Sequence, residues 1–225
     1  MNVRFGSKRS LFRDVLHEKR MITPMRKLTE MVVASGNRGK VREIEMLLKD
    51  LPVRTLSLDD FPDAPAVNED QSTLEGNAIK KAREIAQFTE LPTVADDTGL
   101  EVDALDGRPG VLSARYAGPD SDSKANRALM LVELEGVEQR SARFRTVAAY
   151  VDEDEVYIFE GVCEGVIATT ERGENGFGYD SIFIPEGGSR TFAEMSSEEK
   201  NQISHRSEAF KAFAAFLDSE ISSTP

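Results

Sequence analysis

Residues 31–49, MVVASGNRGKVREIEMLLK, contain the pattern that decides the fold. A short apolar run over 31–35 predicts a strand that ends at Gly36. Over 38–49 the apolar residues recur at helical spacing, which predicts an amphipathic helix. Strand, glycine-containing loop and helix in this order are typical of an α/β protein, in which helices pack on a sheet.

The rest of the chain continues this alternation. Further strands are expected at 53–58, 92–96, 100–105, 142–151, 156–168 and 181–184. Further helices are expected at 72–89, 121–134 and 205–217. Capping boxes mark two helix starts, with Ser72 paired to Glu75 and Ser196 paired to Glu199. The acidic residues 152–155 lie between two long β-rich runs, which predicts a hairpin and therefore a partly antiparallel sheet.

Composition limits the classes of partner. The 225 residues carry a formal net charge of −12, which disfavours nucleic-acid polymers and anionic membranes. No stretch reaches the roughly 18 apolar residues that span a bilayer, and the N-terminus lacks the apolar core of a secretory signal. We therefore expect a cytoplasmic protein. Cys163 is expected to be a small buried hydrophobe in a strand rather than a catalytic thiol.

Residues 1–30 differ from the rest of the chain. They contain eight Lys or Arg against three acids, a net charge of +5. We expect a basic N-terminal extension that is partly disordered, followed by the functional domain at 31–220. The extension can also be a sequence upstream of a true start at Met21, Met25 or Met31. A helix over 10–20 that docks on the acidic body and a transit peptide are further interpretations.

Two segments offer positive charge to an anionic ligand. The loop 35–40, SGNRGK, lies at a helix start, where free backbone N–H groups favour anions and Lys40 adds charge. The Walker spacing is absent, and a plain helix cap explains the loop equally well. Asn77 and Lys81 are four residues apart and share a helix face, although a solvated lysine is the simpler interpretation.

Two adjacent acids, Asp96 and Asp97, end an apolar strand. Successive side chains of a strand point to opposite faces, so one acid can face a cleft while the other braces the loop. Carboxylate oxygens suit Mg²⁺, which takes one or two acids plus substrate phosphates. The alternative is an ordinary acidic turn at a strand end.

The loop 176–180, GFGYD, offers an exposed backbone and the ring of Phe177, which can stack on a nucleobase. Lys200 and Arg206 can neutralise phosphate or recognise a carbonyl oxygen. A glycine turn packed by aromatic residues, with His205 as a helix-terminus residue, is the alternative. The acids, cations, ring and free amides together predict a nucleotide site, whereas a Ser-His-Asp order and Cys/His metal spacing are absent from the sequence.

At this point the chain resembles the inosine triphosphate pyrophosphatase family, the XTP/dITP diphosphatases. The matching stretches are SGNRGK (35–40), EGNAIKKA (75–82), ADDTGLEV (95–102), PGVLSARYAG (109–118), GFGYD (176–180) and EKNQISHR (199–206). They occur in order between about residue 31 and residue 217. The resemblance implies an elongated mixed sheet with flanking helices, two lobes around a central nucleotide-binding cleft, and a homodimer.

The resemblance also implies Mg²⁺-dependent hydrolysis of ITP, dITP and XTP to the monophosphate and pyrophosphate, which cleanses the nucleotide pool. Asp97 would be the proton acceptor and, with Glu69, would hold the metal, while Asp70 is a rival for Glu69. Lys81 would join Asp97 in catalysis and grip the triphosphate. The expected substrate-binding residues are Ser35, Gly36, Asn37, Arg38, Gly39, Lys40, Asn77, Thr98, Phe177, Gly178, Tyr179, Asp180, Lys200, His205 and Arg206. Thr98 falls where the family often has Ser, so the hydroxyl is kept.

Three other functions stay open on the sequence. A Maf-like pyrophosphatase would prefer pyrimidine or modified nucleotides. A nucleotide-binding regulator would bind without turnover, although Asp97, Glu69 and Lys81 argue against this. A purely structural protein with a glycine-rich loop would bind no nucleotide.

Overall fold

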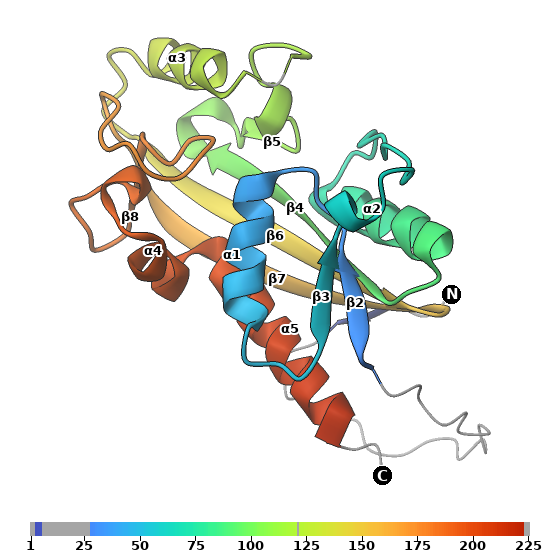
Figure 1. The fold of residues 1–225 in the computed structure, drawn as a ribbon. Coiled ribbons are helices and arrows are strands. Elements are labelled where there is room, and N and C mark those ends of the chain that lie inside the picture. The colour runs from blue at the N-terminus through green and yellow to red at the C-terminus, as the bar shows by residue number, and fades with distance from the viewer. Residues whose placement is uncertain (1–2, 6–27, 121, 223–225) are drawn as a thin grey trace, which may run out of the picture.

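The computed structural model describes residues 3–5, 28–120 and 122–222 (Figure 1). The strands are β1 (Val3–Phe5), β2 (Glu30–Val33), β3 (Arg54–Ser57), β4 (Thr93–Val102), β5 (Pro109–Gly110), β6 (Ser141–Asp152), β7 (Glu155–Ile167) and β8 (Phe183–Pro185). The α-helices are α1 (Arg38–Leu48), α2 (Leu74–Thr89), α3 (Ser123–Glu133), α4 (Ser197–Ile203) and α5 (His205–Ser222). The short 3-10 helices are η1 (Leu58–Asp60), η2 (Asp103–Leu105), η3 (Ser113–Arg115) and η4 (Phe192–Glu194).

All strands of the described residues belong to one mixed sheet. Its order is β1-β7-β6-β4-β2-β3, with β5 beside β4 and β8 beside β7. The long hairpin of β6 and β7 runs from the Ser141–Val166 pair to the Asp152–Glu155 pair, as the sequence predicts. The expected α/β fold with an elongated mixed sheet and flanking helices is confirmed.

β4 is longer than predicted. The sequence predicts two strands, 92–96 and 100–105, but β4 is continuous from Thr93 to Val102 and pairs antiparallel with β6 along that whole length. The polar segment stays extended because its groups find partners inside the sheet. The Thr98 hydroxyl lies 2.7 Å from the hydroxyl of Thr146 on β6. The two acids therefore lie within a regular strand, which fixes their directions.

The two faces of the sheet carry separate cores. Met31 and Val33 belong to a cluster that includes buried residues of α1 and α5, whereas Val32 and Ala34 belong to a cluster that includes buried residues of α2. This alternation follows from the two-residue period of a strand. α2 therefore covers one face, and α1 with α5 covers the other (Figure 1).

The far end of the sheet forms a second lobe. A third core cluster there includes Leu100, Met130, Phe144 and Phe183, which come from β4, α3, β6 and β8. The strands β4, β6 and β7 extend from this lobe to the lobe of α1 and β2 (Figure 1). Cys163 is buried in β7, as expected.

Helix α5 lies directly on β7 at Gly161. A Cβ atom at this position would come within 2.1 Å of the His205 carbonyl oxygen, so only glycine permits the approach. One residue further, the Val162 N–H donates a hydrogen bond of 2.9 Å to the Glu208 carboxylate. These contacts fix the first turn of α5 over the sheet and therefore place the two residues that begin it.

The start of α2 differs from the prediction. The N-cap is Thr73, whose hydroxyl accepts a hydrogen bond of 3.0 Å from the Gly76 N–H, so the predicted Ser72–Glu75 box is wrong by one residue. Capping at Thr73 lets Leu74 begin the helix as a buried residue. The other predicted box, at Ser196 and Glu199, is confirmed and begins α4.

The N-terminal segment contributes one described strand. β1 pairs parallel with the edge of β7, with Val3 opposite Val156. The helix proposed over 10–20 lies outside the described residues. Among the helices that the structure describes, none combines the length and the apolar character needed to cross a membrane.

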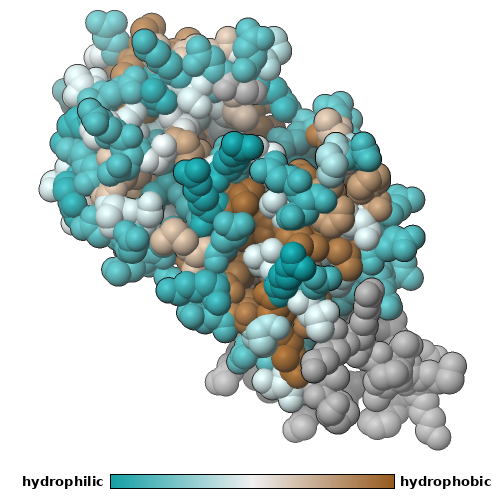
Figure 2. All heavy atoms as spheres, in the orientation of Figure 1, coloured by the Kyte–Doolittle hydropathy of each residue, from teal (hydrophilic) through white to brown (hydrophobic). Residues whose placement is uncertain are grey.

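The surface is polar over much of one face of the molecule (Figure 2). The face drawn in Figure 2 is mostly hydrophilic, and apolar residues are visible mainly in its middle and lower part.

Candidate active site

A cavity of about 830 Å³ opens between the two lobes. Its wall is built from the loop before α1, the loop between η1 and α2, the polar segment of β4, η3, the GFGYD loop, and the start of α5. The residues predicted from sequence to form a site line this cleft, with three exceptions. The exceptions are Arg38, Gly39 and Asn77.

The first group of site residues is centred on Lys81. Its ammonium group lies 2.5 Å from Glu69 Oε1 and 3.7 Å from Asp97 Oδ1, and it donates to the Asp96 carbonyl oxygen at 2.7 Å. Asn77 does not line the cleft but holds Asp97 in place, because its amide donates a hydrogen bond to Asp97 Oδ2 at 2.9 Å. The predicted carboxylates at 69 and 97 therefore converge, with a lysine between them.

The charges of this group are unequal. Burial raises the pKa of Asp97, and Lys81 only partly opposes this because the ion pair is long. Burial acts against the charge of Lys81, but the carboxylates of Asp97, Asp96 and Glu69 outweigh it and raise the lysine pKa. Asp97 therefore accepts a proton more readily than an ordinary aspartate, while Lys81 stays cationic.

Geometry distinguishes Glu69 from its rival. Glu69 lines the cleft, and its carbonyl oxygen accepts a hydrogen bond of 2.9 Å from Arg115 of η3. Asp70 is exposed and pairs with Lys80 on the outer side of α2 at 2.8 Å. The orientation of the two side chains favours Glu69 as the acid that acts in the cleft.

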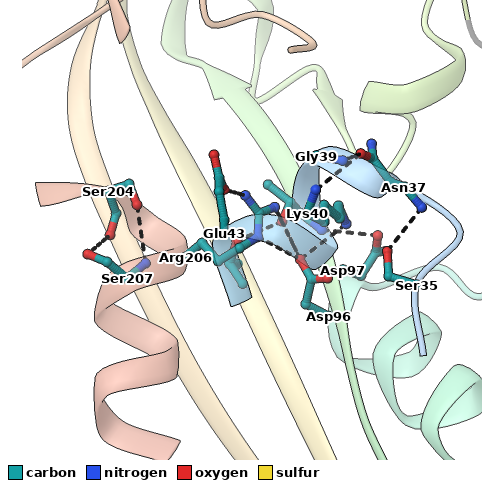
Figure 3. A network of polar contacts seen from close by, with 12 residues as sticks. Ser35, Asn37, Gly39, Lys40, Glu43, Asp96, Asp97, Ser204, Arg206 and Ser207 are labelled. Atoms are coloured by element: carbon teal, nitrogen blue, oxygen red, sulfur yellow. Dashed lines mark hydrogen bonds and ion pairs between the residues drawn. The ribbon is translucent and has the colours of Figure 1, made fainter. Parts of the chain in front are cut away.

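The second group is centred on Asp96, which points to the opposite face of β4 (Figure 3). Its Oδ2 atom lies 3.1 Å from Lys40 Nζ and 3.2 Å from Arg206 Nη2. Burial alone would raise the pKa of Asp96, but the two cations hold it well below its ordinary value. The sequence pattern indicated the acid pair but gave no specific role to Asp96.

Glu43 is a site residue that the sequence did not reveal. It lies on α1 and accepts from Arg206 at 2.5 Å and from Lys200 at 2.8 Å (Figure 3). Lys200 is also held by Asp180 at 2.6 Å. The available signal was an acid beside Ile44 on the apolar stripe of α1, because a charged residue on a buried stripe is rarely found without a partner.

The ring of Phe177 lies against these cations. Lys200 Nζ is 4.8 Å from the ring centroid and the Arg206 guanidinium carbon is 5.7 Å from it. The backbone N–H of Phe177 donates to Asp180 Oδ2 at 2.8 Å, which fixes the loop. Gly39 packs beneath the ring, and a Cβ atom there would come within 2.6 Å of it. Gly39 therefore shapes the site without lining it.

His205 is fully packed beside the cleft. Its ring stacks on Phe144 with centroids 4.5 Å apart, and its Nδ1 atom has no hydrogen-bond partner within the described ranges. Burial, aided by Arg206 and Lys200, lowers the pKa of His205 well below 6.5. The imidazole is therefore neutral near pH 7 and serves as packing and as a neutral polar group.

The loop before α1 is both a helix cap and a wall of the cleft, the two interpretations that the sequence offered. Asn37 is the N-cap of α1 and accepts from the N–H groups of Gly39 and Lys40 at 2.9 and 3.2 Å. Ser35, Gly36 and Lys40 line the cleft. Arg38 points outward, with a side chain that is 82% exposed and lies 3.5 Å from Asp59. The helix cap and the cleft wall therefore share one loop.

Comparison with known proteins agrees with this arrangement. The family model described as the Ham1 family matches residues 31–216. The chain belongs to the Ham1 family. The match covers both carboxylate groups, the GFGYD loop and the start of α5, and it leaves out the basic N-terminal segment.

Members of the Ham1 family with curated names and solved structures are similar along most of the chain. A Geobacter sulfurreducens protein named dITP/XTP pyrophosphatase is 50% identical over 185 residues, which are 81% of this chain and 93% of that one. A Geobacillus kaustophilus protein of the same name is 50% identical over 186 residues, 81% of this chain and 91% of that one. The Ham1 protein structure from Coxiella burnetii has a TM-score of 0.78 at 41% identity, covering 85% of this chain and all of that one.

Proposed function

We propose that this Ham1 family member hydrolyses the non-canonical purine nucleoside triphosphates ITP, dITP and XTP to the monophosphate and pyrophosphate. The observation that carries the proposal is one cleft with two chemically different ends. One end has Asp97, Lys81 and Glu69, and the other has Phe177 with two buried cations. Relatives at 50% identity named dITP/XTP pyrophosphatase support the same activity.

The acids at the first end fit Mg²⁺. The described residues contain no cluster of three or more His, Cys, Asp or Glu that could enclose a metal. Mg²⁺ does not need one, because it takes one or two carboxylates and completes its shell with water and substrate phosphate. Glu69 and Asp97, both within reach of Lys81, would hold the ion, and the bound ion would neutralise phosphate charge.

The chain's own residues at this end position the triphosphate and the water. Lys40 and Lys81 bind phosphate oxygens beside the loop before α1, whose Ser35 and Gly36 line the cleft. Asp97 accepts the proton of the attacking water, a role that its raised pKa suits. The link between the α- and β-phosphates breaks. If water attacks the α-phosphorus, pyrophosphate leaves with the former bridging oxygen. If water attacks the β-phosphorus, pyrophosphate carries the oxygen of water and the monophosphate keeps the bridging oxygen.

The residues at the second end select the base. Lys200 and Arg206 are donors in a buried setting, and Glu43 fixes both of them. A 6-oxo purine offers these donors an acceptor, whereas the amino group of adenine would leave them unpaired. An unpaired buried donor carries a large penalty, so the site discriminates against ATP. Phe177 stacks on the base.

A nucleotide panel assayed with Mg²⁺ and with EDTA tests the function. We expect pyrophosphate release from ITP, dITP and XTP, loss of release in EDTA, and little release from ATP. Preference for dTTP or UTP would support the Maf-like alternative instead. Binding without turnover would indicate a regulator, and the absence of any nucleotide-induced thermal shift would indicate a structural protein.

The metal assignment has a matched pair of variants. Glu69→Gln removes the acid in the cleft, whereas Asp70→Asn removes its exposed neighbour. We expect Glu69→Gln to raise the Mg²⁺ concentration for half-maximal activity by about tenfold or more, and Asp70→Asn to leave it nearly unchanged. Mn²⁺ binding followed by electron paramagnetic resonance gives the same comparison without turnover. Equal effects of the two variants would remove Glu69 from the metal site.

We further propose a cytoplasmic homodimer, as the family resemblance and the composition imply. Light scattering coupled to gel filtration measures the mass, and a monomer at micromolar concentration would contradict the dimer.

A further inference from the structure

Three cations from three helices meet at residue 96. Lys40 of α1 and Arg206 of α5 pair with the side chain of Asp96 at 3.1 and 3.2 Å. Lys81 of α2 donates to its carbonyl oxygen at 2.7 Å. Asp96 itself is not part of the cleft wall. Any influence that it has on a ligand must therefore pass through the groups that it holds.

One oxygen atom makes all the side-chain contacts. Oδ2 forms an ion pair with Lys40 and accepts hydrogen bonds from Nε and Nη2 of Arg206 and from the Thr98 hydroxyl. Oδ1 is buried and forms no hydrogen bond with any of the described residues. The carboxylate is fully buried. In such a low-dielectric setting, two cations that share one acceptor influence each other's position strongly.

The two cations belong to opposite ends of the cleft. Lys40 lies in the first turn of α1 near Ser35 and Gly36, where the proposed function places the phosphates. Arg206 lies near the ring of Phe177 and pairs with Glu43, where the proposed function places the base. Figure 3 shows Asp96 between Lys40 and Arg206.

We propose that Asp96 is a positioning residue that couples the phosphate end of the cleft to the base end by holding Lys40 and Arg206 on one carboxylate oxygen. Occupation of either end shifts one of the cations and thereby changes the placement of the other. The assignment of the two ends rests on the proposed function.

Glu43 provides the matched control. It is also a buried carboxylate and also pairs with Arg206, but its second partner is Lys200, which belongs to the base end. A buried acid that only stabilises the fold would show the same pattern at both positions. Coupling predicts a difference, because only Asp96 contacts a cation of each end.

Calorimetric binding to Asp96→Asn and Glu43→Gln separates the possibilities. The probes are inorganic triphosphate for the phosphate end and inosine for the base end. We expect Asp96→Asn to weaken both probes by about tenfold, and Glu43→Gln to weaken inosine much more than triphosphate, since each lost partner is a charge-assisted contact. If folded Asp96→Asn binds either probe as tightly as the unaltered chain, the coupling is disproved.

If Asp96→Asn does not fold, the variant Lys40→Gln tests the coupling instead. Lys40→Gln removes one cation and leaves Asp96 paired with Arg206. Coupling predicts that Lys40→Gln weakens inosine by at least about threefold, although Lys40 belongs to the phosphate end. Unchanged inosine binding by Lys40→Gln overturns the proposal. A failure of the proposed function looks different, because the unaltered chain would then bind neither probe.

Discussion

The two sides of β4 carry groups of paired acids and cations that differ in how deeply they are buried. On the α2 side, Lys81 is held between acids of which one, Glu69, lies on a loop without regular structure and is 32% exposed. On the α1 and α5 side, Asp96 and Arg206 are buried to within 2% and come from a strand and a helix. The first side therefore has one partly exposed member on a loop, while the pair on the second side is fully buried and comes from regular elements.

This difference matches the two tasks that the proposed function gives to the cleft. A metal and a triphosphate bring their own charges, so the residues that meet them must rearrange when the ligand arrives, and a loop permits this. A neutral base offers only hydrogen bonds and a ring, so selectivity requires donors that are fixed before binding. The contrast predicts that changes on the α2 side affect mainly turnover, whereas changes to the buried residues on the other side affect mainly stability and ligand binding.

Asp97→Asn should give the largest effect on activity. The amide keeps the shape of the side chain but cannot accept the proton of water, so we expect kcat for ITP to fall by about 10³-fold or more. ITP binding should stay largely intact because Lys40 and Lys81 remain. Pyrophosphate release and calorimetric binding measure the two quantities. Hydrolysis at the unaltered rate would show that another group is the base.

Arg206→Met should give the largest effect on stability. It leaves Glu43 and Asp96 buried without their shared partner, so we expect the free energy of unfolding to fall by about 3–5 kcal/mol. Urea denaturation measures this change. Arg54→Met is the control, because the exposed Arg54–Glu30 pair should contribute little. Similar losses in the two variants would contradict the view that the buried pair on this side stabilises the fold.

His205 should make stability depend on pH. The fold keeps its pKa well below 6.5, so on acidification the imidazole takes up a proton in the unfolded chain before it does so in the folded one. Stability from this group is therefore present above pH 6.5 and is lost below it. Between pH 7 and pH 5 we expect a loss of at most about 2 kcal/mol that is missing in His205→Gln. Urea denaturation of both chains at both pH values tests this, and equal losses would refute it.

Arg38→Ala should give the smallest effect. The side chain lies outside the cleft and its ion pair with Asp59 is exposed. We expect KM for ITP to change by less than about twofold, whereas Lys40→Ala should raise it by about tenfold or more. Steady-state kinetics of the two variants compares them. A large KM effect of Arg38→Ala would mean that its side chain turns inward when nucleotide binds.

Sequence predicted the parts of this site that depend on local pattern. The hairpin, the loop before α1 and the adjacent acids follow from periodicity and turn residues, and the resemblance supplied the grouping of distant motifs. The opposite directions of Asp96 and Asp97 followed from strand geometry alone. The continuity of β4 did not, because its polar segment stays extended only through pairing with β6.

Other features depend on contacts between distant segments. The pairing of Glu43 with Lys200 and Arg206 joins α1 to residues more than 150 positions away, and no local pattern reveals it. The N-cap of α2 was misplaced by one residue because Ser72 and Thr73 both have capping side chains, and the burial of Leu74 decides between them. Arg38 and Lys40 are both basic residues of the segment 35–40, so the sequence does not distinguish them. Only the orientation of α1 shows that Lys40 lines the cleft and that Arg38 does not.

The alternation of side chains along β4 also limits how this site can change during evolution. Asp96 and Asp97 point to opposite faces of the strand, so a substitution at one of them leaves the direction of the other unchanged. An insertion or deletion of one residue upstream of this pair in β4 would instead turn each carboxylate to the opposite face of the strand, away from its present partners. Length variation in this family should therefore accumulate in loops such as 61–73, and the spacing along β4 should stay constant.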